Sequence, residues 1–266
     1  MIIGLGKKIL FAGTRGLSVR CLAFLADVLG SSRIAAVLGA PRDDDPWWKG
    51  ESWIELWDLA DLRGIRYVSE DEVETVDYDS IVSVMWNKVF SPGVLSAATF
   101  GGINFHPARL PDYRGSFART HAILNEDRSF SVTMHYIVER VDAGDIIGEL
   151  TFPILPGEGA LSLDMRAQSY GYALFCETIL RLLDGSVVVR SQSSPIEREG
   201  RVSRFYPLNA VQSLMAEPRN GLALADLARL YRALYLPPRL KPPDWLVDRL
   251  EESRSEVLSE VAQQWP

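Results

Sequence analysis

Over the first half of the chain, the hydrophobic positions follow two spacings that alternate with each other. Short apolar runs bounded by glycine or polar residues predict buried strands, at residues 7–14, 33–40, 65–69 and 79–86. Apolar residues at helical spacing predict helices, at residues 18–30, 51–64 and 91–100. Strands that alternate with helices are typical of a parallel sheet with crossover helices. We therefore expect an α/β fold, with a Rossmann-like, mostly parallel twisted sheet and helices on both faces.

Capping residues mark the ends of two predicted helices. Ser18 could cap the start of the first helix, and Gly30 its end. The helix within residues 91–100 is expected to begin after Ser91, with Pro92 at its first position, where no backbone N–H is needed.

Beyond residue 115 the order of the predicted elements changes. A helix, a pair of strands joined by a turn, and a long amphipathic helix are predicted at residues 118–128, 130–154 and 161–185. A hairpin and two further helices are then predicted at residues 186–207, 223–234 and 244–265. We place a boundary near residue 185. It separates a domain of residues 1–185 from a smaller C-terminal hairpin and helical region of residues 186–266.

The composition restricts the class of protein. The chain has 266 residues, of which 47% are hydrophobic, so it can bury a substantial core. Its net charge of -7 argues against nucleic acid or an anionic membrane surface as the main partner. No apolar run approaches the length of a membrane span. The two cysteines, Cys21 and Cys176, provide no disulfide framework, and we expect a cytoplasmic protein.

The turn after the first predicted strand reads Gly-Thr-Arg-Gly and lacks the glycine spacing of a dinucleotide site. A nicotinamide cofactor is therefore not expected. A phosphate could still bind to backbone amides and the guanidinium of Thr14, Arg15 and Gly16, although an ordinary glycine turn explains these residues equally well. The three histidines, His106, His121 and His135, are not spaced for a zinc site, and we predict no metal.

Candidate catalytic residues lie where a predicted strand ends, in the stretch INFHPARLPDYRG at residues 103–115. Asn104 and His106 are two residues apart, so in a strand they point to the same face, and Pro107 ends the strand. In open α/β sheets, ligands bind beyond the carboxyl ends of the strands. The best candidate for an accompanying acid is Asp142 in the turn VDAGD, where an aspartate also simply favours a turn.

These two segments together resemble the folate-dependent formyltransferase family. INFHPARLPDYRG and SVTMHYIVERVDAGDII supply its Asn-x-His-Pro, Leu-Pro-x-Tyr-Arg-Gly, Thr-x-His and Asp-x-Gly motifs at the family spacing. The pair Ala108-Arg109 departs from the small residues common in the family and does not touch the motif residues. The resemblance implies a catalytic domain within residues 1–185 and 10-formyltetrahydrofolate as the formyl donor. It also implies a catalytic set of Asn104, His106 and Asp142.

The resemblance further implies binding residues. The folate is expected along the loop after the fourth strand, at Asn87, Lys88, Val89 and Phe90. It is also expected at Val141, beside the turn VDAGD that carries Asp142, which we call the acid loop. Substrate contacts are expected at Thr14, Arg15, Gly16, Tyr113 and Arg114. The aromatic residues Phe205 or Tyr206, and alternatively Trp47 and Trp48, are candidates for the base or sugar of a nucleotide.

Within the family, the tail segments REGRVSRFYP and LYRALYLPPRLKPP are similar to the sugar N-formyltransferase branch. That similarity implies a nucleotide-linked amino sugar as acceptor, in surface-glycan (O-antigen) or natural-product biosynthesis. The alternatives are a methionyl-tRNA formyltransferase-like enzyme, another small-molecule amine formyltransferase, or an inactive folate-binding scaffold module.

The final predicted helix places a row of apolar residues on one side: Leu246, Leu250, Val257, Leu258 and Val261. Such a face needs a partner, either in its own domain or in a second copy of the chain, and we expect a homodimer.

Overall fold

The computed structural model describes residues 5–42, 52–216, 221–237 and 239–264. Trp47 and Trp48, the alternative candidates for nucleotide binding, lie outside these residues.

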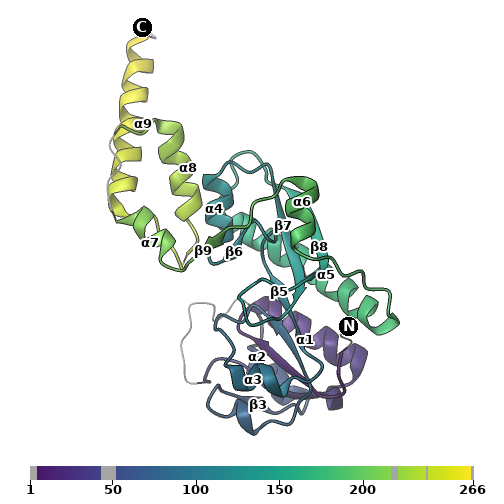
Figure 1. Ribbon diagram of the computed structural model, residues 1–266. Helices are drawn as coiled ribbons and strands as arrows, with labels where there is room; N and C mark the ends of the chain where they lie inside the picture. Colours follow the sequence, from purple (N-terminus) through teal and green to yellow (C-terminus); the bar gives the residue numbers. More distant parts are fainter. Residues whose placement is uncertain (1–4, 43–51, 217–220, 238, 265–266) are drawn as a thin grey trace. The chain divides into compact units, whose positions relative to one another are not determined.

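A seven-stranded sheet forms the centre of the fold (Figure 1). Its strands follow the order β3-β2-β1-β4-β5-β7-β8. Their bounds are β1 Ile9–Gly13, β2 Ile34–Leu38, β3 Tyr67–Val68, β4 Ser80–Val84, β5 Gly102–His106, β7 Ser129–Tyr136 and β8 Ile146–Pro153. The first five are parallel to their neighbours, whereas β7 runs antiparallel to β5. The expected mostly parallel sheet is confirmed.

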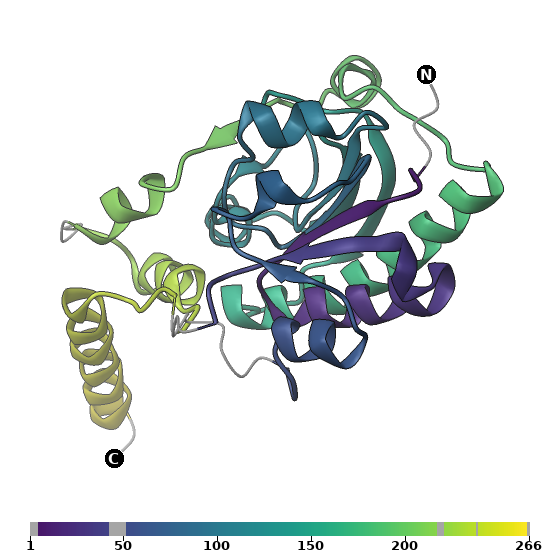
Figure 2. The same ribbon diagram turned by 90° about the horizontal axis from the view of Figure 1, so that it is seen from below.

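Helices cover both faces of the sheet. On one face, α1 (Gly16–Leu29) lies beside α5 (Ala160–Asp184), as Figure 2 shows. Phe24 of α1 meets Tyr172 and Phe175 of α5 edge-on, with ring centroids 6.5 and 6.4 Å apart. The helix α2 (Leu56–Leu62) packs beside α1.

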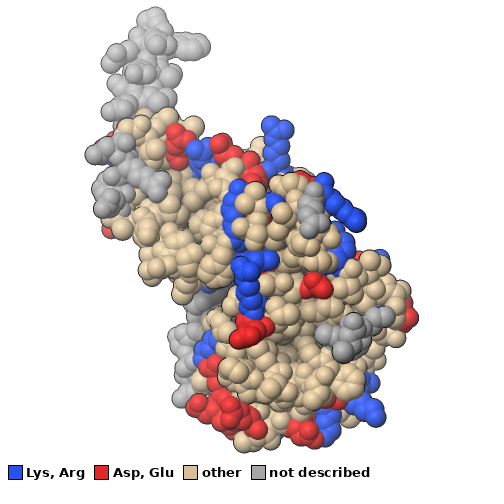
Figure 3. All heavy atoms as spheres, viewed as in Figure 1, with Lys and Arg blue, Asp and Glu red and all other residues tan. Residues whose placement is uncertain are grey.

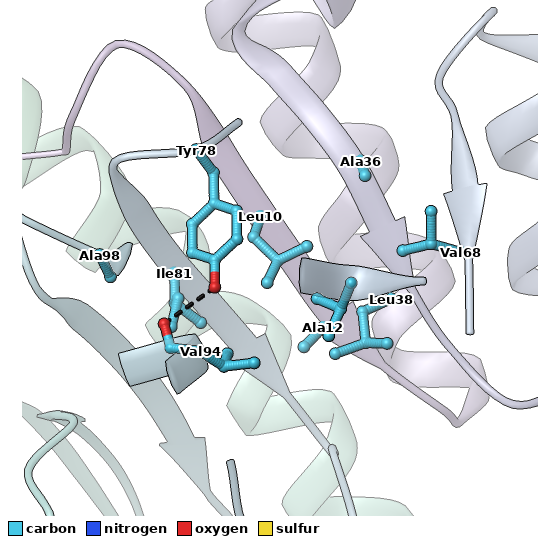
Figure 4. Packing of buried hydrophobic residues seen from close by; sticks show 10 residues of the cluster. Leu10, Ala12, Ala36, Leu38, Val68, Tyr78, Ile81, Val94 and Ala98 are labelled. Atoms are coloured by element: carbon cyan, nitrogen blue, oxygen red, sulfur yellow. Dashed lines mark hydrogen bonds between the residues drawn. The ribbon is translucent and has the colours of Figure 1, made fainter. Parts of the chain in front are cut away.

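On the opposite face, α3 (Pro92–Ala97) closes a core cluster drawn in Figure 4. Val94 of α3 is buried with Leu10 and Ile81 from neighbouring strands. The Tyr78 hydroxyl donates to the Val94 carbonyl at 2.8 Å, which ties the loop before β4 to this helix. Ser91 accepts a hydrogen bond from the Val94 N–H, and Pro92 occupies the first turn, so the predicted cap is confirmed.

The start of α1 differs from the prediction. The helix begins at Gly16, and Arg15 rather than Ser18 is its N-cap residue. The Ser18 hydroxyl donates instead to the Val84 carbonyl at 2.6 Å and accepts from the Thr14 N–H. The serine therefore joins the ends of β1 and β4, a long-range contact that the local capping pattern does not contain. Gly30 ends the helix with φ 84°, as predicted.

The predicted hairpin within residues 186–207 is wrong. Arg190 exchanges backbone hydrogen bonds with Ile146 at the start of β8. Residues Ser193–Glu199 form the helix α6, and β9 (Phe205–Tyr206) pairs with β6 (Arg114–Gly115). Each half of the expected hairpin thus takes a partner far away in the sequence.

The segments pack into two compact units that interleave along the chain. The first unit contains residues 1–114, 131–151 and 167–205, and the second contains residues 115–130, 152–166 and 206–266. These units show which segments pack together. The assignment of residues 1–185 to a catalytic domain stays a prediction.

The second unit is mainly helical. Its helices include α4 Ala118–Leu124, α7 Ala210–Met215, α8 Leu224–Leu234 and α9 Asp244–Gln264. The first unit also contains two 3₁₀ turns, η1 Ser31–Arg33 and η2 Val73–Thr75. The Thr120 hydroxyl of α4 donates to the Ala233 carbonyl of α8 at 2.8 Å. The His121 ring stacks on Tyr206, with centroids 3.9 Å apart.

The final helix already buries part of its predicted apolar face. Leu246 is fully buried, and Leu250 is half-buried. The side chains of Val257, Leu258 and Val261 lie outside the described part of the structure. None of the helices in the described residues is long and apolar enough to cross a membrane.

The contact between α5 and β5 gives a stability prediction. A Cβ at Gly171 would lie 2.4 Å from the ring of Phe105. Phe105 is a buried residue of β5 and lies between Asn104 and His106 in the sequence. Gly171→Ala gains about 1 kcal/mol of helix propensity. We expect a net loss of about 1–3 kcal/mol, because the buried ring must move. Thermal unfolding measures this loss.

Gly93→Ala in α3 is the matched control. A Cβ there would lie 3.3 Å from the end of the flexible Glu74 side chain and 3.7 Å from the Ser91 hydroxyl, which is ordinary contact. We expect an unchanged or slightly raised melting temperature for this variant. Equal melting temperatures for Gly171→Ala and Gly93→Ala would contradict the proposed close approach of α5 to β5.

The buried histidine of the second unit predicts acid sensitivity. Burial lowers the pKa of His121 from about 6.5 to about 4. Between these values the unfolded chain binds the extra proton and the folded chain does not, so stability falls as the pH drops through this window. The loss can reach about 3 kcal/mol. His121→Phe keeps a ring against Tyr206 and cannot take up the proton.

We therefore expect His121→Phe to melt close to the wild type near neutral pH and several degrees above it at about pH 4.5. Thermal unfolding of both proteins across this range tests the effect. Parallel curves for the two proteins would show that His121 does not contribute to acid sensitivity.

Candidate active site

Asn104 and His106 project from the carboxyl end of β5. The Asn104 side chain points to the same face as His106, with Phe105 on the other face against Gly171. The His106 side chain is 7% exposed. Pro107 follows directly, and the Ala108 N–H turns back to the His106 carbonyl at 2.8 Å.

A second histidine, His135 on β7, lies directly opposite Asn104 in the antiparallel register. Its Nδ1 lies 2.8 Å from the Tyr136 carbonyl, which can only accept, so Nδ1 carries the proton. In the neutral ring, Nε2 is then an acceptor, and it receives the Asn104 Nδ2–H at 3.1 Å. This contact fixes the amide of Asn104 and leaves its second N–H for a ligand. No pattern in the sequence indicates this role of His135.

His106 uses its two ring nitrogens differently. Nε2 lies 2.6 Å from the Tyr113 carbonyl and donates to it, while Nδ1 faces the Asp142 carboxylate at 3.5 Å. Asp142 therefore stands where it can stabilise a proton gained at Nδ1.

Asp142 completes the cluster from the loop between β7 and β8. Its carboxylate is 12% exposed and lies 3.5 Å from His106 and 3.6 Å from His135. Its backbone has φ 51°, a left-handed conformation that non-glycine residues seldom adopt and that recurs at functional sites. Gly144 is needed in the same loop, because a Cβ there would fall 1.9 Å from the Tyr136 carbonyl. The structure thus brings Asn104, His106 and Asp142 together.

The acid loop is tied to Arg114 through Gln192, a residue that the sequence argument did not single out. Gln192 Nε2 donates to the carbonyls of Asp142 and Gly144, each at 2.8 Å. Its Oε1 accepts from Arg114 Nε at 3.1 Å and Nη2 at 2.6 Å. Burial, and then repulsion from Arg140, lower the pKa of Arg114.

The predicted substrate residues occupy two places. Thr14 and Arg15 lie between β1 and α1, and Gly16 begins α1, at the point where the strand order reverses. The Thr14 hydroxyl donates to the Met85 carbonyl at 2.5 Å. The side chains of Thr14 and Arg15 are buried. Tyr113 is also buried, and it contributes its backbone carbonyl to His106.

The predicted folate residues follow β4, and Asn87, Lys88 and Val89 are exposed. Phe90 stacks on Trp86, with centroids 6.2 Å apart and 17° between the planes. Since β1, β4 and β5 are parallel, this loop emerges from the same edge of the sheet as Thr14 and His106.

Further side chains of the loop after β4, and Val141 on the acid loop, bear on the proposed folate site. The Val89 side chain is 71% exposed, an apolar surface that a flat ring could cover. The buried Nε1 of Trp86, which the sequence argument also missed, has no hydrogen-bond partner among the described residues. Lys88 pairs with Glu70. On the acid loop, Val141 is 38% exposed.

The tail aromatic residues separate. Phe205 is exposed, whereas Tyr206 stacks on His121 within the second unit. Among the described residues, no group of three or more His, Cys, Asp or Glu side chains is arranged to hold a metal ion.

Comparisons with known proteins find related sequences and related folds. Residues 67–179 match the family model described as formyl transferase. A methionyl-tRNA formyltransferase of Bacillus licheniformis is 31% identical over 198 residues, which cover 70% of this chain and 61% of the relative. The chain thus spans a little over 60% of the length of the first such relatives.

Solved structures share the fold over more of the chain. WlaRD, a sugar 3N-formyl transferase crystallised with dTDP and 5-N-formyl-THF, is similar with a TM-score of 0.70 and 22% identity, covering 88% of this chain and 81% of that one. The N-formyltransferase from Helicobacter canadensis, in complex with folinic acid and dTDP-3-aminofucose, is similar with a TM-score of 0.69 and 21% identity. The match covers 86% of this chain and 80% of that one. Over residues 67–179 the chain is similar to the formyl transferase family, and its fold is the one that these solved structures share.

Proposed function

We propose that the protein transfers the formyl group of 10-formyltetrahydrofolate to the amino group of a nucleotide-linked amino sugar. The observation that carries the transfer chemistry is the cluster of Asn104, His106 and Asp142 at the carboxyl edge of the sheet. The choice of acceptor is supported by the sugar N-formyltransferases whose fold covers 86–88% of this chain, including much of its tail.

Each residue of the cluster has a distinct part in this proposal. Attack of an amine on the formyl carbon puts negative charge on the formyl oxygen, and Asn104 donates its second N–H to that oxygen. His106 takes up the proton that the amine loses, at Nδ1, and Asp142 stabilises the imidazolium that results. The folate nitrogen that leaves must regain a proton, and His106 is the group that returns it.

The proposed folate site uses the loop after β4. The backbone at Lys88, Val89 and Phe90 supplies hydrogen-bond partners for the pterin edge, and the exposed Val89 and Val141 side chains offer apolar contact. For the acceptor, Thr14–Gly16 and Arg114 are the proposed partners of the diphosphate. Tyr113 contributes by holding His106, and Phe205 is proposed near the base or sugar.

A methionyl-tRNA formyltransferase-like activity is the second candidate. It is favoured by the curated relatives at about 30% identity, which carry that name. The acidic chain argues against it, because nucleic-acid binding draws on clustered basic residues. On the face drawn in Figure 3, basic and acidic side chains both occur, and wide areas carry neither.

A homodimer, a cytoplasmic location and a place in surface-glycan or natural-product biosynthesis remain part of the proposal.

A panel of amines incubated with 10-formyltetrahydrofolate tests the function. We expect nucleotide-linked amino sugars to gain the mass of a formyl group in place of a hydrogen. Charged initiator tRNA and glycinamide ribonucleotide should remain unchanged, and mass spectrometry separates these outcomes. Transfer to the charged tRNA alone would favour the second candidate. Failure to bind the folate at all would refute both.

Substitutions in the cluster test the roles. We expect His106→Asn and Asp142→Asn to lower kcat by about 10²–10⁴ with little loss of folate affinity, since each keeps the approximate volume and polarity. Asn104→Ala should cost about 10²–10³. Because the residues act as a unit, the double variant His106→Asn/Asp142→Asn should be scarcely slower than the slower single variant.

Asp145→Asn is the matched control, because Asp145 lies in the same loop and its side chain is exposed. It should turn over at nearly the wild-type rate. If Asp142→Asn keeps more than about a tenth of wild-type turnover, Asp142 is not the group that stabilises the protonated His106. Loss of activity in Asp145→Asn alone would assign that part to Asp145.

A further inference from the structure

Gln192 is a buried amide whose hydrogen-bonding atoms are all directed at the candidate active site. The residue is 4% exposed and lies between α5 and α6, beyond the segment that matches the family model. Its Nε2 donates to two carbonyls of the acid loop, and its Oε1 accepts two hydrogen bonds from Arg114.

The two carbonyls that Gln192 binds belong to the backbone that carries the Asp142 carboxylate. They belong to Asp142 itself and to Gly144, and so they bracket the tip of the loop. Asp142 holds a left-handed backbone conformation, which persists only where its surroundings fix it. Two hydrogen bonds of 2.8 Å from one rigid amide plane supply such a constraint.

The Oε1 atom of the same amide holds the positively charged guanidinium of Arg114 beside the loop that carries Asp142. Arg114 reaches Gln192 through two nitrogens, and its guanidinium also attracts Asp142. The charged and titratable groups beside Asp142 include His106 from β5, His135 from β7 and Arg114, and Arg140 lies near Arg114.

We propose that Gln192 is a positioning residue for the formyl transfer, holding the Asp142 carboxylate between His106 and His135 through its two N–H donors. The catalytic part of this inference rests on the proposed function. Gln192 touches no reacting atom and acts through Asp142. The segment after α5 thus completes the active site rather than forming a separate appendage.

Two substitutions distinguish the contribution of the Gln192 N–H donors from that of its acceptor oxygen. Gln192→Met keeps the approximate length and removes all four hydrogen bonds. Gln192→Glu keeps an acceptor for Arg114, removes both donors and places a negative charge against two carbonyls. Tyr78→Phe is the control, because it deletes one buried hydrogen bond of the same length in the core cluster of Figure 4, away from the active site.

The measurements are thermal unfolding, kcat and KM for both substrates, and the titration of the histidines by NMR. The chain has only three histidines, which makes their signals separable. Single-residue replacements of His106 and His135 assign these signals. The titration reports on the neighbourhood of His106 whether or not the protein is active.

We expect Gln192→Met and Gln192→Glu to lose about 10–100-fold in kcat, the effect of a misplacement of about 1 Å, with a nearly unchanged KM for the folate. In Gln192→Met the His106 titration should move to lower pH relative to wild type, because the carboxylate is no longer held at Nδ1. Tyr78→Phe should lose a similar few degrees of melting temperature and keep both the wild-type kcat and the wild-type titration.

The inference is overturned if Gln192→Met behaves like Tyr78→Phe, with lowered stability but unchanged turnover and titration. If Gln192→Met does not fold, Gln192→Leu takes its place in every measurement. If the wild type transfers no formyl group to any acceptor, the proposed function fails. An altered His106 titration in Gln192→Met would then still support the positioning of Asp142, and an unaltered one would refute it.

Discussion

The candidate active site depends on one register between two strands. β5 is the last parallel strand of the sheet, and β7 adds to it in the antiparallel direction with Asn104 opposite His135. A shift of one residue would turn His135 to the other face and leave the Asn104 amide without its acceptor. Phe105 helps to hold this register, because the face opposite the site is packed against Gly171 of α5. The polar residues are thus fixed by apolar packing on the reverse side of their own strand.

The parts of this arrangement that local sequence determines were predictable. Alternating strand and helix patterns gave the parallel sheet, and the Ser91 cap and Gly30 stop were read from single positions. The two-residue spacing of Asn104 and His106 was enough to place both side chains on one face. Asp142 could be chosen because a recognised motif places an acid there, whereas turn propensity alone explains an aspartate at that position equally well.

The misjudged features depend on contacts between distant segments. Ser18 looked like a cap, but its hydroxyl binds the Val84 carbonyl, 66 positions away. Residues 186–207 looked like a hairpin, but Arg190 pairs with Ile146. Gln192 gave no signal at all, since a single glutamine in a polar stretch has no periodicity to detect. Its importance appears only when the acid loop and Arg114 are brought to it.

The segment after α5 is attached by buried polar groups more than by apolar packing. Arg201 donates to both carboxylate oxygens of Glu149 and to the Leu110 carbonyl, while Val202 and Phe205 remain more than half exposed. Asp112 lies in the same network, and burial raises its pKa despite the nearby Arg109 and Arg201. Hydrogen bonds of this kind are directional, so they fix the position of a loop where apolar contacts would tolerate sliding. His106 contacts the Tyr113 carbonyl and the Asp142 carboxylate, which lie in two different loops. Arg201 restrains the first loop by binding the Leu110 carbonyl, and Gln192 restrains the second by binding the Asp142 carbonyl.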